Sequence, residues 1–138
     1  MQVNPYLLYN GNCEEAFNYY VRALGGKVDM MARYQGSPAA DHVPPEWASK
    51  VMHAQLSIDG EVLMAADALP GTAKPPAGFA VSLQVEDPAK ADRVFAALAD
   101  GGEITMPIDK TFWARRFGMC VDRFGIPWMI ELRVTTPL

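Results

Sequence analysis

The order of the expected elements occurs twice along the chain. Residues 8–67 and 83–133 each read as a strand, a helix and then three strands, with small insertions between the elements. A repeated order of elements is informative about architecture even where few residues are identical. Two βαβββ modules in tandem give eight strands and two helices. We therefore predict an α+β fold, in which the modules form a curved, mostly antiparallel sheet and the helices cover its outer face.

The first helix carries signals at both ends. Asn12 is predicted to cap a helix over 13–24, with Glu15 three residues later as the second half of a capping box. Apolar residues recur within the segment at helical spacing, and Gly25-Gly26 stands directly after it. A glycine at this position accepts the left-handed conformation with which many helices end.

The second helix repeats these signals with different residues. Asp87 is predicted to be the cap and Pro88 the first helical residue of a helix over 88–99, because proline's fixed φ suits that position. Gly101-Gly102 then supplies the stop. The two helices thus occupy equivalent places in the repeat.

Turn residues mark the hairpins and the junction between the modules. Asp59-Gly60 predicts the turn of the first hairpin, and the second hairpin is predicted to turn through residues 122–125, with Gly125 at positive φ. The proline-rich and glycine-rich segment 68–78 suits neither helix nor interior strand. With 138 residues the chain matches one average domain. We predict a single domain of two modules, 1–67 and 79–138, joined by this linker.

Charge and composition restrict the partners. The net charge of −4 disfavours a broad electrostatic footprint on nucleic acid or on anionic membranes. The apolar runs are strand-sized, and the N-terminus lacks the pattern of a secretory signal, so we expect a cytoplasmic protein that does not enter membranes. Cys13 and Cys120 lie in no metal-ligand spacing and are expected to pack as small hydrophobic residues, although a helix start could make the Cys13 thiol modestly reactive. A small organic molecule is the expected partner.

Strand alternation separates two faces of the predicted sheet. One set of side chains is apolar and is predicted to pack against the helices. Its members are Met52, Ala54, Leu56 and Ile58, then Phe79, Val81, Leu83 and Val85, and finally Trp128, Ile130 and Leu132. The opposite set is mixed in polarity. Its members are His53, Gln55 and Ser57, then Ala80, Ser82 and Gln84, and finally Met129, Glu131 and Arg133.

The mixed face has two interpretations. It could be solvated on its outer side, as in many antiparallel sheets. Alternatively it could line a concave pocket for a small molecule, because methionines and aromatic residues mix there with few polar groups. The residues predicted to line this pocket are His53, Gln55, Met64, Ser82, Gln84, Trp113, Arg116 and Met129.

Three motifs resemble a known superfamily. They are YLLYNGNCEEAFNYYVRALGG, MHAQLSIDGEVLMAAD and FWARRFGMCVDRFGIPWMIE, and together they cover nearly the whole chain. The chain is similar to the vicinal oxygen chelate superfamily of glyoxalases, extradiol dioxygenases and bleomycin-resistance proteins. It resembles most closely the PhnB-like branch, often labelled 3-demethylubiquinone-9 3-methyltransferase-like. The resemblance implies a glyoxalase-like fold and a homodimer.

The resemblance also implies a divalent metal as cofactor in the metal-using relatives. Their ligands are His or Gln on the opening strand and Glu on the closing strand of each half, and Glu131 stands where the last Glu belongs. The other three positions depart from this pattern. They offer Pro5, Tyr6 or Leu7, then Met64 or Ala66, and then Ala80 or Ser82. The ligand set is therefore incomplete, no residue is assigned to a metal, and coordination by His53 is a second choice to a structural role.

Glu131 has two interpretations of its own. Without a metal, its carboxylate could pair with the guanidinium of Arg116 or Arg133. It could instead be a catalytic general acid or base at the floor of the pocket. The sequence does not choose between an internal ion pair and a catalytic group.

The segment 34–50 is long and rich in proline, which predicts a lid, a partner contact or disorder rather than another element. Trp47 could cap the pocket, or it could anchor this loop to the body of the protein or to a second subunit. His42 is expected to be exposed to solvent.

Two function classes follow. The first is a protein that binds or sequesters a small organic molecule, which needs only the pocket. The second is a metal-dependent lyase, isomerase or dioxygenase that uses Glu131 as a ligand. Methyl transfer is disfavoured, because no glycine-rich turn between a strand and a helix suits a nucleotide-like cofactor.

Overall fold

The computed structural model describes residues 1–133 and divides the chain into two compact units, Met1–Lys74 and Pro75–Leu138. The boundary between the units falls inside the predicted linker 68–78. We call the first unit module 1 and the second module 2.

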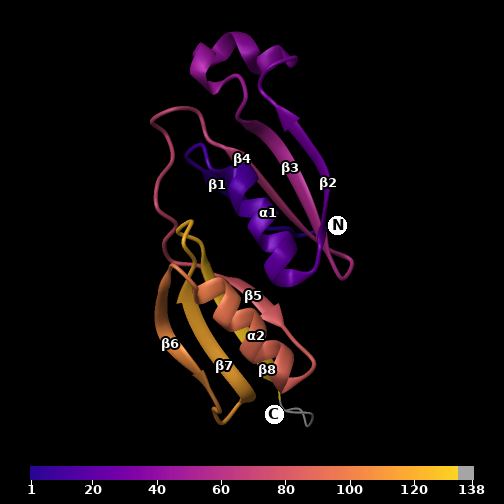
Figure 1. Cartoon of the computed structure of the whole chain (residues 1–138), viewed down its shortest axis with the longest axis vertical. Helices are drawn as coiled ribbons and strands as arrows, with labels where there is room; N and C mark the ends of the chain where they lie inside the picture. Colours follow the sequence, from indigo (N-terminus) through magenta and orange to yellow (C-terminus); the bar gives the residue numbers. More distant parts are fainter. Residues whose placement is uncertain (134–138) are drawn as a thin grey trace. The chain divides into compact units, whose positions relative to one another are not determined.

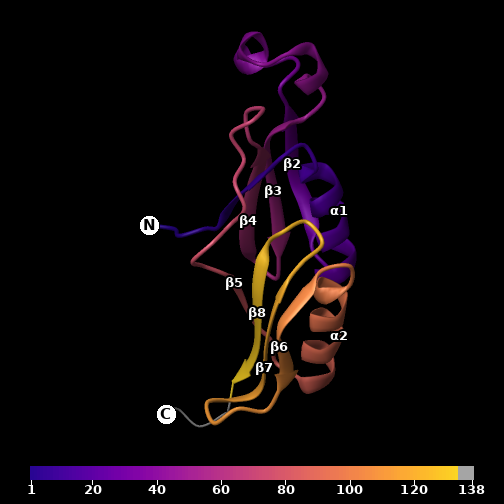
Figure 2. The ribbon, with the colours of Figure 1, turned by 90° about the vertical axis from the view of Figure 1, so that its left-hand side faces the viewer.

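Module 1 is a four-stranded sheet with one long helix on one face (Figures 1 and 2). Its elements are β1 Tyr6–Tyr9, α1 Cys13–Leu24, β2 Lys27–Arg33, the 3-10 helices η1 Pro38–His42 and η2 Pro45–Trp47, β3 Val51–Ile58 and β4 Glu61–Asp67. The strand order is β1-β4-β3-β2. The β1–β4 pair is parallel and the other two pairs are antiparallel, so the sheet is mixed.

Module 2 repeats this topology. Its elements are β5 Val81–Gln84, α2 Pro88–Ala99, β6 Glu103–Asp109, β7 Ala114–Val121 and β8 Pro127–Arg133. The strand order is β5-β8-β7-β6, again with the opening strand parallel to the closing one and α2 on one face (Figures 1 and 2). The predicted α+β class and the two βαβββ modules are confirmed, and each module forms a mixed sheet of its own.

The cap of α1 differs from the prediction. The side chain of Asn12 makes no capping hydrogen bond. Instead the buried carboxylate of Asp67, at the end of β4, accepts hydrogen bonds at Oδ1 from the backbone N–H groups of Gly11 (2.9 Å) and Cys13 (3.0 Å). Its Oδ2 accepts from the N–H of Val51 at 2.9 Å. One side chain therefore joins the start of α1, the start of β3 and the end of β4.

A buried aspartate also organises the hairpin of module 2. Asp122 Oδ1 accepts from the N–H groups of Phe124 and Ile126, both at 2.9 Å, and its Oδ2 accepts from Trp128 Nε1 at 2.8 Å. Gly125 has φ +92°, as predicted for this turn. The carboxylate thus fixes both the turn and the indole of Trp128 near the start of β8.

The other predicted start and stop signals are confirmed. Asp87 caps α2 by accepting from the N–H of Lys90 at 2.9 Å. Gly25 ends α1 in the left-handed conformation at φ +79°. Asp59 and Gly60 have φ of +50° and +83°, as a two-residue hairpin turn with both central residues at positive φ requires.

The second glycine of each helix stop has a different function from the first. A Cβ atom on Gly26 would lie 2.3 Å from the carbonyl oxygen of Ser57, and one on Gly102 would lie 2.1 Å from that of Val121. No real Cβ approaches an oxygen so closely. These glycines are therefore required by the close passage of the backbone against the neighbouring hairpin.

The core follows most of the predicted alternation. Ala54, Leu56, Trp128, Ile130 and Leu132 are buried as expected. The intermediate positions are Met52, Ile58, Val81, Leu83 and Val85. Phe79 was predicted to be a core residue, which is wrong: it precedes β5 and is 57% exposed. β5 is an edge strand, so within residues 1–133 β8 is its only neighbour in the sheet. Phe79 precedes the first residue of β5 and is therefore not covered by that neighbour.

Both thiols are buried, and burial raises their pKa values, that of Cys120 to about 11. The Asp67 carboxylate raises the pKa of Cys13 further. The predicted packing role is confirmed for both, whereas a thiol held in its protonated form does not support the reactive alternative for Cys13.

Segment 34–50 is folded onto module 1, so the prediction of disorder without further elements is wrong. It forms η1 and η2, and Trp47 Nε1 donates to the carbonyl of Ala68 at 3.1 Å. Lys50 Nζ donates to the carbonyl of Gly11 at 2.9 Å. The interpretation of Trp47 as an anchor of the loop to the body is confirmed, and His42 is exposed as expected.

An ion pair at the start of α1 gives a pH-dependent prediction. Arg33 donates to both carboxylate oxygens of Glu14, at 3.1 and 2.7 Å, and these hydrogen bonds lower the pKa of Glu14. A lowered carboxyl pKa stabilises the folded state above the unfolded pKa, and the contribution is lost as the pH falls through the folded pKa. Glu14→Gln should therefore cost at most about 1 kcal/mol of unfolding free energy near neutral pH.

This cost should vanish once the pH falls below the lowered pKa of Glu14, because the wild-type carboxyl is then protonated as well. Urea unfolding near neutral pH and in acid measures both values. Glu15→Gln in the same helical turn is the matched control, since Glu15 is exposed and experiences the same helix dipole. An equal cost for the two substitutions near neutral pH would show that the Arg33 pair contributes nothing.

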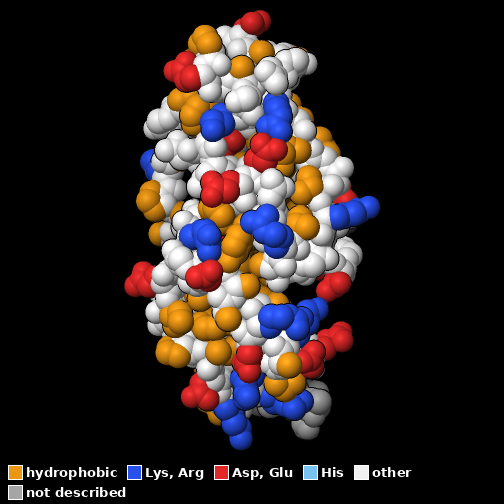
Figure 3. Space-filling model, in the orientation of Figure 1, with side chains coloured by type: hydrophobic (Ala, Val, Ile, Leu, Met, Phe, Trp, Pro, Cys, Tyr) orange, Lys and Arg blue, Asp and Glu red, His pale blue; other side chains and the backbone are white. Residues whose placement is uncertain are grey.

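Figure 3 shows positively and negatively charged side chains interspersed with hydrophobic ones over the helices. No large area of one sign is visible on this face. Within residues 1–133, no helix has the length and apolar character that crossing a membrane would require.

Candidate functional site

The face of each sheet that lies opposite its helix carries most of the predicted site residues. We call it the open face of the module. Residues paired across neighbouring strands point to the same side, so the strand registers define its members. In module 1 they include Tyr6, Leu8, Met30, His53, Gln55 and Met64. In module 2 they include Ser82, Gln84, Phe117, Met119, Met129 and Glu131.

Seven of the nine predicted site residues therefore lie on open faces through their strand positions. His53, Gln55 and Met64 belong to module 1. Ser82, Gln84, Met129 and Glu131 belong to module 2. Strand alternation was sufficient to place them, because each stands within a regular stretch of its strand.

Arg116 lies on the opposite face, so its predicted membership of the pocket is wrong. A bulge at the start of β7 brings it opposite Leu132, whose side chain is in the core, and its Nε lies 3.5 Å from Asp92 Oδ1 on α2. The predicted pairing of Arg116 with Glu131 is excluded for the same reason. The other predicted partner, the Arg133 side chain, lies outside the described part of the chain.

Trp113 joins the open face of module 2 from the segment before β7. Its ring meets that of Phe117 edge to face, with centroids 5.3 Å apart and planes at 70°. Phe117 stands opposite Glu131 in the register. The ring of Phe112 also meets the indole edge to face, with centroids 4.6 Å apart, and Phe112 is itself 85% exposed. The aromatic group therefore borders the carboxylate of Glu131.

Glu131 is hydrogen-bonded to the neighbouring strand. Gln84 lies opposite it in the parallel β5–β8 pair and donates from Nε2 to Glu131 Oε2 at 3.0 Å. The same amide lies 3.3 Å from Ser82 Oγ. Alternation placed Gln84 on this face, but its contact with Glu131 depends on the pairing of two strands that are 47 residues apart.

An aromatic pair occupies the open face of module 1. Tyr6 Oη and His53 Nδ1 are 2.9 Å apart, and the two rings are stacked at 5.6 Å and 28°. Burial raises the pKa of Tyr6, so the phenol is protonated at neutral pH. Sequence reasoning named Tyr6 only as one of the residues that stand where metal-using relatives have a metal ligand. It missed the pair because β4 lies between β1 and β3 and both rings must reach across it.

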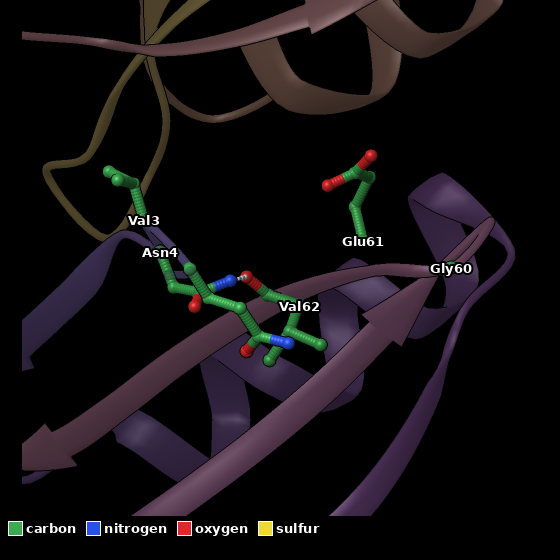
Figure 4. A pocket seen from close by; sticks show the side chains of 6 residues that line it. Val3, Asn4, Gly60, Glu61 and Val62 are labelled. Atoms are coloured by element: carbon green, nitrogen blue, oxygen red, sulfur yellow. Dashed lines mark hydrogen bonds between the residues drawn. The ribbon is translucent and has the colours of Figure 1, made fainter.

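Module 1 also contains a small cavity that none of the predicted pocket residues lines (Figure 4). Its volume is about 230 Å³. It is lined by Gln2, Val3, Asn4, Gly60, Glu61 and Val62. The N-terminal segment and the β3–β4 turn form it, and the amide of Asn4 donates to the carbonyl of Val62 at 3.1 Å.

Comparison with known proteins relates the whole chain to one family. The family described as 3-demethylubiquinone-9 3-methyltransferase matches residues 1–131. The chain belongs to this family.

Two relatives align with nearly the whole length of this chain. Protein YjdN of Escherichia coli K12 is 34% identical over 96% of this chain and 95% of its own length. The crystal structure of protein PA1353 from Pseudomonas aeruginosa is 43% identical, covers 96% of this chain and 98% of its own, and superposes with a TM-score of 0.87.

A more distant likeness concerns the fold alone. A glyoxylase/bleomycin resistance protein/dioxygenase domain from Frankia sp. EAN1pec is 17% identical, covers 97% of this chain and 98% of its own, and has a TM-score of 0.65. The predicted glyoxalase-like fold is thereby confirmed.

The residues present do not fit a metal held as in the metal-using relatives of this fold. Gln84 and Glu131 could give two oxygen donors, but Gln84 turns its N–H toward the carboxylate. On the open face of module 1, the paired positions of β1 and β4 hold Tyr6 with Met64 and Leu8 with Ala66, and none of these four is a carboxylate, an imidazole or an amide side chain. Within residues 1–133, no three His, Cys, Asp or Glu side chains are grouped as metal ligands. Protein metal sites ordinarily need three or four such ligands.

Proposed function

We propose that this protein binds a small organic molecule on the open faces of its sheets and that its metal site is degenerate or absent. The observation that carries this proposal is the composition of those faces. Each combines apolar side chains, such as Met64 and Met129, with one hydrogen-bonded pair, Tyr6–His53 or Gln84–Glu131. Mostly apolar surroundings with a few fixed polar groups are typical of small-molecule sites.

Glu131 orients the ligand in this proposal. Its hydrogen bond from Gln84 fixes the position of the carboxylate, and the Trp113–Phe117 rings border it. A hydroxyl or amino group of the ligand can donate a hydrogen bond to this carboxylate, while the rest of the ligand contacts the aromatic rings. If the protein is an enzyme, the same carboxylate is the group placed to act as general acid or base.

The alternative is a metal-dependent lyase, isomerase or dioxygenase with Glu131 as a ligand. It is favoured by one observation, the position of an amide and a carboxylate side by side on the opening and closing strands of module 2. Ligands from outside module 2 would be required to complete such a site.

Metal titration distinguishes the two proposals. After chelation, neither wild type nor Glu131→Gln is expected to bind Zn²⁺, Ni²⁺, Mn²⁺ or Fe²⁺ stoichiometrically, as measured by metal analysis and calorimetry. Glu61→Gln, which removes an exposed carboxylate on β4, is the matched control. Stoichiometric binding that Glu131→Gln abolishes and Glu61→Gln retains would establish the metal-dependent alternative.

Ligand binding is tested in solution by NMR with three simple probes, benzoate, benzamide and benzyl alcohol. The expected result is a change in signals of open-face residues, with smaller changes on the helix-covered faces. If none of the three changes the open-face signals at millimolar concentration, the proposed function fails for small aromatic ligands.

The assembly and location belong to the same proposal. We propose a homodimer, supported by large apolar side chains at the surface outside the open-face positions, such as Phe79 at 57% exposure, since exposed apolar patches are typical of interaction sites. Light scattering at micromolar concentration tests the dimer, and a monomer mass would refute it. The buried free cysteines support a reducing, cytoplasmic location. Partners other than the ligand and a second copy, such as nucleic acid or a membrane, are not proposed.

A further inference from the structure

We propose that the Tyr6–His53 pair recognises the carboxylate of an aromatic or similarly planar acid, and that protonation of His53 controls this recognition. This rests on the proposed function and specifies its ligand class. The pair lies on the open face of module 1, where Tyr6 Oη and His53 Nδ1 are 2.9 Å apart.

The hydrogen bond between the two side chains has a direction that depends on charge. In a neutral imidazole with its proton on Nε2, Nδ1 is an acceptor and the Tyr6 hydroxyl donates to it. When His53 takes a proton from water at Nδ1, that atom becomes a donor and the phenol oxygen accepts. Tyr6 keeps its own hydrogen, which then turns away from His53 toward a ligand.

The charged pair therefore offers a ligand two donors, the Tyr6 O–H and the His53 Nε2–H, together with a positive charge. A carboxylate has two acceptor oxygens, and hydrogen bonds between ionised groups are stronger than neutral ones. The neutral pair keeps only the Nε2–H as a free donor and turns the lone pairs of the Tyr6 oxygen outward, which is less favourable for an anion. Carboxylate binding should thus weaken when His53 loses its proton.

The surroundings of the pair support both the charge and the ligand shape. The strand residues that flank His53 on this face are uncharged. They are Ala32 on β2, Gln55 and Ser57 on β3, and Met64 and Ala66 on β4. Farther along β2, Asp29 accepts a hydrogen bond from Ser57 Oγ and pairs with Lys27 at 3.9 Å, so these two charges offset each other. On these strands Tyr6 is thus the titratable group that contacts the imidazole. The stacked rings and the exposed side chains of Leu8 and Met30 match an apolar, planar ligand body.

The open face of module 2 favours a ligand group of a different charge. It carries the carboxylate of Glu131 beside Gln84, which repels an anion and accepts hydrogen bonds. An acidic group is therefore assigned to module 1.

The hydrogen bond can be tested without any ligand. The chain has two histidines, and the exposed His42 is an internal reference in NMR spectra of the imidazole nitrogens. At about pH 8, where free imidazole is mostly neutral, Tyr6→Phe is expected to change the His53 Nδ1 signal and to leave those of His42 unchanged. An unchanged His53 signal would overturn the assigned contact. The side chains of Tyr6 and His53 are both at least partly exposed, so variants at these two positions should fold.

The ligand class is tested with benzoate and its neutral analogue benzamide, titrated at about pH 6 and about pH 8. Benzoate is expected to bind about tenfold more tightly at the lower pH, as the loss of one favourable charge contact predicts. Benzamide should show no such difference. His53→Gln should remove the pH dependence, whereas the matched control His42→Gln should retain it.

The outcomes separate the two proposals. Benzoate and benzamide binding to the open faces with equal affinity at both pH values would refute the role of the pair and leave the proposed function intact. Binding of benzamide or benzyl alcohol without benzoate would refute the carboxylate class. Absence of binding by all three probes would refute the proposed function for such ligands together with this inference.

Discussion

Asp67→Ala is expected to lower the unfolding free energy by about 3–5 kcal/mol, since a buried polar group without a partner costs about 1–3 kcal/mol. The substitution leaves the N–H groups of Gly11, Cys13 and Val51 without their acceptor. Because the carboxylate is buried, water reaches these donors only if the structure opens. The loss should therefore be much larger than that of an ordinary helix cap.

Urea or thermal unfolding measures this effect, with two further variants as references. Asp67→Asn keeps one acceptor oxygen but sets an amide N–H₂ against a backbone donor, so an intermediate loss is expected. Asp41→Ala removes an exposed aspartate and should change stability by no more than about 0.5 kcal/mol. Equal stability of Asp67→Ala and Asp41→Ala would show that the three hydrogen bonds contribute nothing net.

Gly26→Ala is expected to destabilise module 1 by about 3 kcal/mol or more, at or above the upper end of the usual cost of overpacking. The new methyl group would stand 2.3 Å from the Ser57 carbonyl oxygen and 2.8 Å from a side-chain carbon of Ile58. The first of these is backbone within β3, which cannot move without breaking the β2–β3 pairing.

Gly25→Ala is the matched control one residue earlier. A Cβ there meets no atom within 4 Å, so the substitution only forces an alanine to adopt φ +79°. Its cost should be about 1 kcal/mol. The two variants, compared by urea unfolding, separate backbone strain from steric conflict. A smaller loss for Gly26→Ala than for Gly25→Ala would contradict the close approach.

Sequence reasoning predicted the fold well because its signals are local. The cap at Asp87, the turn at Asp59-Gly60 and the stop at Gly25 depend on the conformation of a few adjacent residues. Where such a signal had a competing partner elsewhere in the fold, it failed. Asn12 has the residue type of a cap, but the Asp67 carboxylate supplies the acceptor.

The candidate site was predictable only in part. Alternation placed His53 and Glu131 on open faces because both stand in regular strand positions. Arg116 was named as a pocket residue without such a parity argument, and the bulge at the start of β7 sets it opposite the core residue Leu132. A bulge in this position has no sequence signal that we recognised.

The contacts between site residues were beyond sequence reasoning. Tyr6 meets His53 over 47 residues of chain, and Gln84 meets Glu131 over the same separation. Each contact depends on the closing strand of a module lying beside its opening strand. Periodicity assigns a side chain to a face, but it does not specify which strand lies next to which.

The sequence by itself determined the elements, their repetition, their turns and the side of the sheet to which most side chains point, because backbone geometry and hydrophobic period act over a few residues. Only the tertiary structure decided which groups meet: Asp67 with the start of α1, Tyr6 with His53, and Arg116 with α2. These contacts join strands and helices distant in the chain, and their pairing follows from the burial of a whole sheet face rather than from any local pattern.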